Sequence, residues 1–240
     1  MKGIILAGGK GTRLKPLTDV VCKQLLPVYD KPMIIYPLKT LISLGIKEVL
    51  IISDEKNLND FKNLLGFGLD FNISITYEIQ EIPKGIAEAF IIGKNFIKND
   101  KVCLILGDNL FFANNFFNDK TKILLKGSKI FLKKVNNPNK YGVMEMDLKS
   151  NPVLIHEKPS DYISNFVVVG LYMFDNSVIK IAESLVPSKR NELEITDINN
   201  FFLKNKNSEC VHLPEDSEWF DSGTFDSLLK ASNFVKNLKL

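Results

Sequence analysis

The chain has 240 residues, of which 45% are hydrophobic, and its formal net charge at pH 7 is +3. This length and composition allow a full hydrophobic core, in one large domain or two small ones. The charge is small, no basic block stands out, and no apolar stretch approaches the length of a membrane helix, so neither nucleic acid nor a membrane is expected as a partner.

The three cysteines, Cys22, Cys103 and Cys210, lie far apart in the chain. They form no Cys-x-x-Cys pair, which argues against both a zinc site and a disulfide framework. The N-terminus has no charged-then-apolar signal pattern and begins directly with a strand pattern. We therefore expect a protein of the reducing cytoplasm.

The first half of the chain alternates between two hydrophobic patterns. Short apolar runs typical of strands are followed by segments in which apolar residues recur at helical spacing. This alternation predicts an α/β fold of the Rossmann-like kind, a mixed but mainly parallel sheet flanked by helices. The expected strands are 2–7, 49–53, 73–79 and 102–106, and the expected helices are 33–44 and 87–97.

The second half is less regular. Several strand patterns follow one another with Asn, Pro, Lys and Asp between them, which favours a smaller β excursion of mixed direction. No repeat or long linker appears, so residues 1–240 are expected to form a single domain. The expected strands are 128–135, 142–146, 153–157 and 166–174, and the expected helices are 177–185, 196–203 and 225–238.

A glycine cluster follows the first strand in the stretch GIILAGGKGTRLKPLT, residues 3–18. Gly8, Gly9 and Gly11 allow positive φ and let backbone N–H groups approach an anion, and ligands of open parallel sheets bind at this end of the strands. The stretch lacks GxxxxGK[ST], and Leu14 stands where GxGxxG needs its third glycine, which disfavours a P-loop and a dinucleotide-dependent oxidoreductase.

Arginine is rare in this chain. Only Arg13 and Arg190 stand among the 31 basic residues. Arginine offers a planar fork that matches phosphate in two contacts, whereas lysine offers a point charge. Arg13 lies in the glycine loop and Lys23 follows it, so both cations are candidates for a phosphate clamp.

The chain resembles the nucleotidyltransferases that join a sugar 1-phosphate to a nucleoside triphosphate. The opening stretch and CKQLLPVYDKPMI carry the resemblance, followed in order by LILGDN, YGVMEMD, HEKP, VVGLYMFDN, RNELEITDIN and WFDSGTFDSLLKAS. The likeness covers nearly the whole chain. Within that family the chain is most similar to enzymes that use dTTP and glucose 1-phosphate. The resemblance implies a nucleotide-binding half over about residues 1–110, and a half with the sugar site and the second metal ligand over about 111–240.

The implied reaction is attack of a sugar-phosphate oxygen on the α-phosphorus of the triphosphate, with loss of pyrophosphate. The nucleophile is already an anion, so cations and positioning carry the catalysis. Asp108, which follows a buried strand, is well placed to hold Mg²⁺, and the resemblance gives Asp221 as the second metal carboxylate. The expected catalytic residues are Arg13, Lys23, Asp108 and Asp221.

The resemblance also implies two sets of binding residues. Gln80 ends a strand and offers the donor and acceptor that one pyrimidine edge needs. The nucleotide set is Leu6, Gly8, Gly9, Gly11, Thr12, Arg13, Lys23, Gln80, Gly85 and Asp108. The sugar-phosphate set is Asn109, Tyr141, Gly142, Glu157, Lys158, Val168, Arg190 and Trp219.

Two details qualify these sets. His156 adjoins Glu157, but alternation along a strand sends its side chain to the opposite face, so it has no expected role. Asn191 stands where the family commonly has glycine, and asparagine tolerates a left-handed backbone better than most residues.

Two alternatives for the function remain open. The same reaction could use UTP or another sugar 1-phosphate, since one methyl group gives only about 1–3 kcal/mol of discrimination. A non-catalytic sensor of nucleotide or sugar is a different class, against which the four catalytic residues argue. Longer relatives continue past the last helix, and this chain ends at Leu240, so we expect a dimer rather than a tetramer, and the resemblance leaves open whether the feedback control of those relatives is kept.

Overall fold

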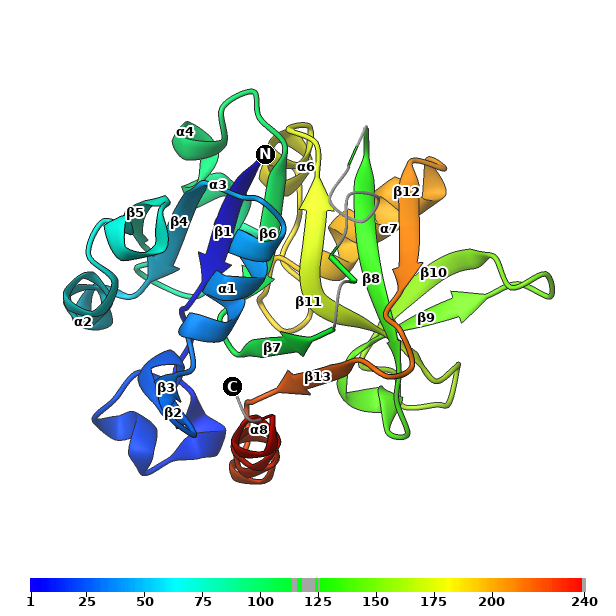
Figure 1. The fold of residues 1–240 in the computed structure, drawn as a ribbon. Helices are drawn as coiled ribbons and strands as arrows, with labels where there is room; N and C mark the ends of the chain where they lie inside the picture. The colour runs from blue at the N-terminus through cyan, green and yellow to red at the C-terminus, as the bar shows by residue number, and fades with distance from the viewer. Residues whose placement is uncertain (114–115, 118–123, 125, 239–240) are drawn as a thin grey trace. The chain divides into compact units, whose positions relative to one another are not determined.

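The computed structural model describes residues 1–113, 116–117, 124 and 126–238 (Figure 1). Its contacts divide the chain into two compact units. The first unit comprises Lys2–Pro83, Ile105–Phe112 and Glu218–Leu240, and the second comprises Met1, Lys84–Leu104 and Ala113–Ser217. Strand β6 (Val102–Leu106) carries the chain from the second unit into the first.

A parallel sheet runs through the first unit. Its strands are β1 (Lys2–Leu6), β4 (Glu48–Ser53) and β5 (Ser74–Ile79), coloured blue to cyan in Figure 1. Ile5 pairs with Ile51 in the centre of this sheet, and both side chains are fully buried. Such continuous apolar runs are typical of parallel strands covered on both faces.

Two longer helices follow strands of this sheet. Helix α1 (Ile35–Ser43) lies within the predicted span 33–44, whereas α2 (Glu55–Leu65) was not predicted. Asp54 caps α2 by accepting from the Asn57 N–H at 3.0 Å, and Gly66 ends the helix. The remaining short elements are η1 (Thr12–Leu14), η2 (Leu17–Asp19), η3 (Lys23–Leu25), β2 (Pro27–Val28), β3 (Lys31–Pro32) and η4 (Leu69–Phe71).

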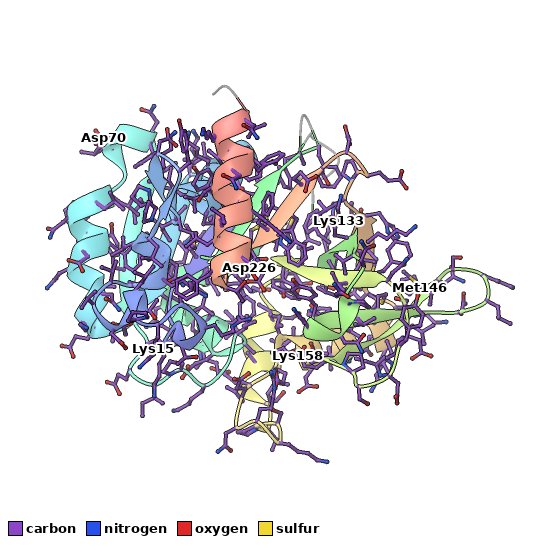
Figure 2. All side chains as sticks on the ribbon, turned by 90° about the horizontal axis from the view of Figure 1, so that it is seen from below. Lys15, Asp70, Lys133, Met146, Lys158 and Asp226 are labelled. Atoms are coloured by element: carbon purple, nitrogen blue, oxygen red, sulfur yellow. The ribbon has the colours of Figure 1, made fainter. Side chains whose placement is uncertain are left out.

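The C-terminal segment completes the first unit. Strand β13 (Glu218–Asp221) pairs antiparallel with β7 (Asn109–Phe112), and α8 (Phe225–Asn237) follows. Thr224 and Ser227 form a capping box at the start of α8, and Asp226 lies exposed in its first turn (Figure 2). The buried core beneath these elements consists of Val28, Met33, Tyr36, Leu110, Ala231 and Val235.

The second unit has a sheet of mixed direction. Strands β10 (Pro152–Glu157), β9 (Gly142–Met146), β11 (Phe166–Phe174) and β8 (Ser128–Lys134) pair antiparallel in that order. Strand β12 (Ser208–His212) then adds to β8 in parallel. The sequence predicts the four antiparallel strands closely but not β12.

Short helices accompany this sheet. They are α3 (Glu88–Ile92), α4 (Lys94–Ile97), η5 (Pro138–Lys140), α6 (Val178–Glu183) and α7 (Ile195–Lys204). The single helix expected over 87–97 is two helices, because Gly93 leaves helical geometry at φ −77°, ψ 3°. Among the residues described, no helix is long and apolar enough to cross a membrane.

Candidate active site

The glycine loop of the first unit follows β1 and folds back on itself. Gly9 and Gly11 have φ of +104° and +57°, in the region that favours glycine. A Cβ at Gly9 would meet nothing within 4 Å, so this backbone is open to a ligand. The Thr18 hydroxyl donates to the Gly11 carbonyl at 2.8 Å and closes the turn that contains Thr12 and Arg13.

Gln80 lies directly against this loop. It follows β5 and is 3% exposed, and a Cβ at Gly8 would stand 2.4 Å from its Oε1. Gly8 therefore has to lack a side chain for the Gln80 amide to lie where it does. Leu6, also in the nucleotide set, is the last residue of β1.

Gly85, another residue of the nucleotide set, belongs to the second unit. A Cβ there would lie 2.4 Å from the Leu193 carbonyl oxygen, and the Leu193 N–H donates to the Lys84 carbonyl at 2.6 Å. The glycine allows two backbone segments to lie in contact.

Two carboxylates and one lysine form a charged cluster in the first unit. The Lys23 ammonium donates to Asp108 Oδ2, and the Asn109 amide donates to Asp108 Oδ1 at 3.1 Å. Burial is the largest single influence and raises the pKa of Asp108, but the charge and hydrogen bond of Lys23, together with the hydrogen bond from Asn109, leave that pKa lowered. Burial, together with the negative charge of Asp108, raises the pKa of Asp221 to about 6.

Backbone pairing accounts for the proximity of the two carboxylates. Asp221 pairs with Asn109 across β13 and β7, and the Ser222 N–H donates to the Asp108 carbonyl at 2.9 Å. A segment more than a hundred residues later in the sequence thus brings the second carboxylate to the first.

Gly223 is a site residue that the sequence analysis missed. A Cβ at this position would lie 2.8 Å from an Arg13 guanidinium nitrogen and 3.1 Å from Asp221 Oδ1. The absence of a side chain lets the Arg13 fork reach the carboxylate cluster. The signal was present in the sequence, because Gly223 stands two residues after Asp221 in the quoted WFDSG motif.

Trp219 and Asn109, two residues of the sugar set, belong to this first unit. The Trp219 indole N–H donates to Asn109 Oδ1 at 2.8 Å across the β7–β13 pair. The Asn109 side chain therefore links the indole to Asp108.

The donor set of this cluster fits magnesium. Mg²⁺ in phosphoryl-transfer sites is held by one or two carboxylates together with phosphate oxygens and water. Asp108 and Asp221 supply two carboxylates, and the raised pKa of Asp221 reflects first its burial and then repulsion from Asp108. Within the described part of the chain no group of three or more His, Cys, Asp or Glu forms a metal cage.

A second group of predicted residues meets in the second unit. Glu157 pairs with Gly142 across β10 and β9. The Thr196 hydroxyl donates to Glu157 Oε2 at 2.6 Å, and Arg190 donates to Oε1 at 3.2 Å. A Cβ at Gly142 would stand 3.5 Å from both Glu157 Oε2 and Thr196 Oγ1, so Gly142 lies directly beside this carboxylate.

Arg190 is held by carboxylates. Glu194, which is 8% exposed, accepts from two of its nitrogens at 3.1 and 2.7 Å, and also accepts from Ser188. Burial alone would raise the pKa of Glu194, but the hydrogen bonds from Arg190 and Ser188 lower it. Asn191 has φ +59°, the left-handed backbone that the sequence analysis expected it to tolerate. Glu194 and Thr196 were missed, although both stand in the quoted RNELEITDIN motif.

The remaining sugar-set residues surround this group or line its sheet. Lys158 (Figure 2) has φ +45°, and its Nζ lies 3.7 Å from Glu157. The Lys158 N–H donates to the Tyr141 carbonyl at 3.0 Å. Val168 is a buried residue of β11. His156 points away from Glu157 and contacts Glu145 instead, at 2.7 Å, as strand alternation predicts.

Each unit therefore carries a polar cluster suited to phosphate chemistry. The cluster of the first unit combines an open glycine backbone with Arg13, Lys23 and two carboxylates. These are the groups that transfer of a nucleotidyl group requires. The cluster of the second unit has a carboxylate that can accept hydrogen bonds from hydroxyl groups, beside an arginine and a lysine. This combination defines a phosphate-transferring class of enzyme.

Comparison with known proteins identifies the family. The model of the family described as "Nucleotidyl transferase" matches residues 2–237. A glucose-1-phosphate thymidylyltransferase of Neisseria meningitidis is 46% identical, and one of Mycolicibacterium smegmatis is 47% identical. Both alignments cover 100% of this chain and 84% of the relative. The chain belongs to the nucleotidyl transferase family, and it is an enzyme of the transferase class.

Solved structures agree on the fold. A Bacillus anthracis protein described as a glucose-1-phosphate thymidylyltransferase is 36% identical with a TM-score of 0.92, covering 100% of this chain and 97% of its own. A UDP-glucose pyrophosphorylase bound to UDP-glucose is 25% identical with a TM-score of 0.86, covering 99% of each chain. The predicted α/β fold class, with its mainly parallel sheet flanked by helices, is confirmed.

Proposed function

We propose that this protein is a glucose-1-phosphate thymidylyltransferase that converts dTTP and glucose 1-phosphate into dTDP-glucose and pyrophosphate. The observation that carries the proposal is the full-length identity of 46–47% to relatives with that activity. In the reaction, a phosphate oxygen of the sugar phosphate forms a bond to the α-phosphorus. The bond between the α-phosphorus and the oxygen bridging to the β-phosphorus breaks, and its electron pair leaves with pyrophosphate.

The first unit would bind the triphosphate. The open backbone at Gly9 and Gly11 suits phosphate oxygens, and Arg13 and Lys23 neutralise charge that builds on the leaving pyrophosphate. The Gln80 amide offers one donor and one acceptor to the thymine edge. Since Gln80 lies against Gly8, base and phosphate recognition would be held in a fixed relation.

Asp108 and Asp221 would hold Mg²⁺, which supplies charge neutralisation at the phosphate oxygens. The chain's own part is to keep both carboxylates ionised at neutral pH. Lys23 does this for Asp108, and Arg13 and Lys23 oppose the burial that raises the pKa of Asp221.

The second unit would bind glucose 1-phosphate. Glu157 accepts hydrogen bonds from sugar hydroxyls, and Arg190 and Lys158 are cations for the sugar phosphate. Glu194 keeps the Arg190 fork in one orientation through two hydrogen bonds. No strong base is required, because the attacking phosphate oxygen is already an anion.

The proposal is tested by pyrophosphate release with glucose 1-phosphate and Mg²⁺, comparing dTTP, UTP, ATP, CTP and GTP. Fast release with dTTP supports it. Release with UTP at a comparable kcat/KM would favour the second candidate, uridylyl transfer, which the likeness to a UDP-glucose-bound structure brings forward. Absence of release with every triphosphate and a panel of sugar 1-phosphates would overturn both candidates and favour a binding protein.

A further inference from the structure

A cavity of about 530 Å³ lies in the second unit, in contact with helices α4 and α6, both labelled in Figure 1. None of its lining residues belongs to the sets described above. Three lysines, Lys94, Lys98 and Lys180, line it together with three asparagines and Ile179; the asparagines are Asn95, Asn99 and Asn176.

The charge balance of this lysine cavity is positive. Glu183 is the one acidic lining residue, and its Oε1 accepts from Lys94 at 2.6 Å. Lys98 and Lys180 make no ion pair with any residue that the structure describes. Two ammonium groups are therefore left to face a ligand, beside amides that can donate further hydrogen bonds.

The backbone at Lys98 gives an independent indication of function. Lys98 ends α4 with φ 54° and ψ −120°, and its N–H donates to the Lys94 carbonyl at 3.0 Å. Gly66 ends α2 in nearly the same conformation, with φ 53° and ψ −136° and the same hydrogen bond to Lys62. Glycine adopts this conformation without cost, whereas a lysine Cβ is strained there.

Strain of this kind persists where the side chain has a use, and it gathers at ligand sites. Lys98 ends α4 in the conformation that glycine adopts at the end of α2. The lysine therefore adds a positive charge to the cavity and lowers stability relative to glycine. We propose that the lysine cavity binds a small phosphate-bearing anion, through Lys98 and Lys180 with hydrogen bonds from the neighbouring amides. Lysine ammonium groups act as point charges for phosphate, and three amides would fix its orientation.

The test is a titration of the full-length protein with inorganic pyrophosphate, without divalent metal, followed by backbone amide NMR. The reference titration uses sodium chloride at matched ionic strength. We expect saturable shifts at residues 94–99 and 176–183 with pyrophosphate but not with chloride. Absence of these shifts, or equal shifts with chloride, would overturn the proposal, whether or not the protein transfers nucleotides.

Variants distinguish anion binding at this cavity from a general effect of the protein's positive charge. Lys98→Gly/Lys180→Gln should weaken the fitted affinity at these residues at least tenfold. Lys56→Gln/Lys149→Gln removes the same two charges from exposed positions elsewhere and should leave the affinity unchanged. Equal affinity in all three proteins would contradict the assignment.

Two single variants test whether Lys98 lowers stability while it contributes to anion binding. Lys98→Ala removes the charge and keeps the strained backbone, so binding is lost and Tm stays near wild type. Lys98→Gly removes both, so binding is lost and Tm rises by about 2–4 °C. A Tm for Lys98→Gly at or below that of Lys98→Ala would overturn the inference from strain.

Discussion

Glu194 accepts hydrogen bonds from two nitrogens of Arg190. Arg190 Nε lies 3.1 Å from Glu194 Oε1, and a terminal guanidinium nitrogen lies 2.7 Å from Oε2. The carboxylate comes from the residue before α7 and is largely buried, so the arginine is anchored to a rigid element. The hydrogen bonds to Glu194, and then the negative charge of that carboxylate, raise the pKa of the Arg190 guanidinium further. Arg190 thus behaves as a preorganised cation rather than a free surface side chain.

Glu194→Gln should therefore weaken the binding of sugar phosphate selectively. The neutral amide holds the fork less firmly, and we expect the KM for glucose 1-phosphate to rise roughly tenfold, about 1.4 kcal/mol, with the KM for dTTP nearly unchanged. Steady-state kinetics with each substrate varied in turn measures this. Glu192→Gln, at a more exposed carboxylate 3.2 Å from Arg190, is the control and should have a smaller effect. Equal increases in both KM values would contradict a positioning role.

Gly223→Ala should displace Arg13. The new methyl group would lie 2.8 Å from the guanidinium, and because that group ends a flexible side chain, the arginine moves while the fold stays intact. We expect the KM for dTTP to rise several-fold with little change in Tm. In an Arg13→Ala background the same change should have no further effect on KM, and additive effects in this double-mutant cycle would show that Gly223 acts elsewhere.

Magnesium binding should depend on pH through Asp221. Its pKa is raised to about 6, so the carboxylate gains a proton as the pH falls through 6 and loses its charge for the metal. The affinity for Mg²⁺ should be about tenfold weaker at pH 5 than at pH 7, because one proton must be released on binding. Calorimetric titration of Mg²⁺ at both pH values measures the ratio. Asp221→Asn should bind weakly at both, and a variant that kept the pH dependence would assign it to another group.

Gly85→Ala should lower the free energy of unfolding by more than the cost of placing alanine at a positive φ. A Cβ at Gly85 would press on the Leu193 backbone, whereas a Cβ at Gly45, also at positive φ, would meet nothing within 4 Å. We expect Gly45→Ala to cost about 1 kcal/mol and Gly85→Ala a further ~1–3 kcal/mol. Urea unfolding of both variants measures the difference, and equal costs would show that the contact with Leu193 relaxes freely.

The sequence predicted those elements that are signalled locally. The apolar runs of β1, β4 and β6 need no partner to be recognised, and their observed bounds differ from the expected ones by a residue or less. Helix α2 was missed because most of its residues are polar, although Asp54 before it and Leu58, Phe61 and Leu65 at helical spacing mark it. Strands β7 and β13 were missed because each is short and exists only through its distant partner.

The same distinction applies to the site. Arg13 stands in the glycine loop, Asp108 follows a glycine at a strand end, and Lys23 lies in the quoted CKQLLPVYDKPMI motif, so residue types and positions identified them as candidates. Gly223, Glu194 and Thr196 act through contacts with side chains elsewhere in the chain, which spacing along the sequence does not reveal.

The first unit is assembled from three separate chain segments, so its parts become available at different times during synthesis of the chain. The glycine loop, Lys23 and Gln80 leave the ribosome first, and Asp108 follows, but Asp221, Gly223 and helix α8 come within the last segment, Glu218–Leu240. A nascent chain of two hundred residues therefore has the phosphate loop with only one of the two carboxylates. The carboxylate pair therefore assembles only after Asp221 has been synthesised, more than a hundred residues after Asp108, and truncation shortly before Glu218 would leave a chain that has the loop and lacks the pair.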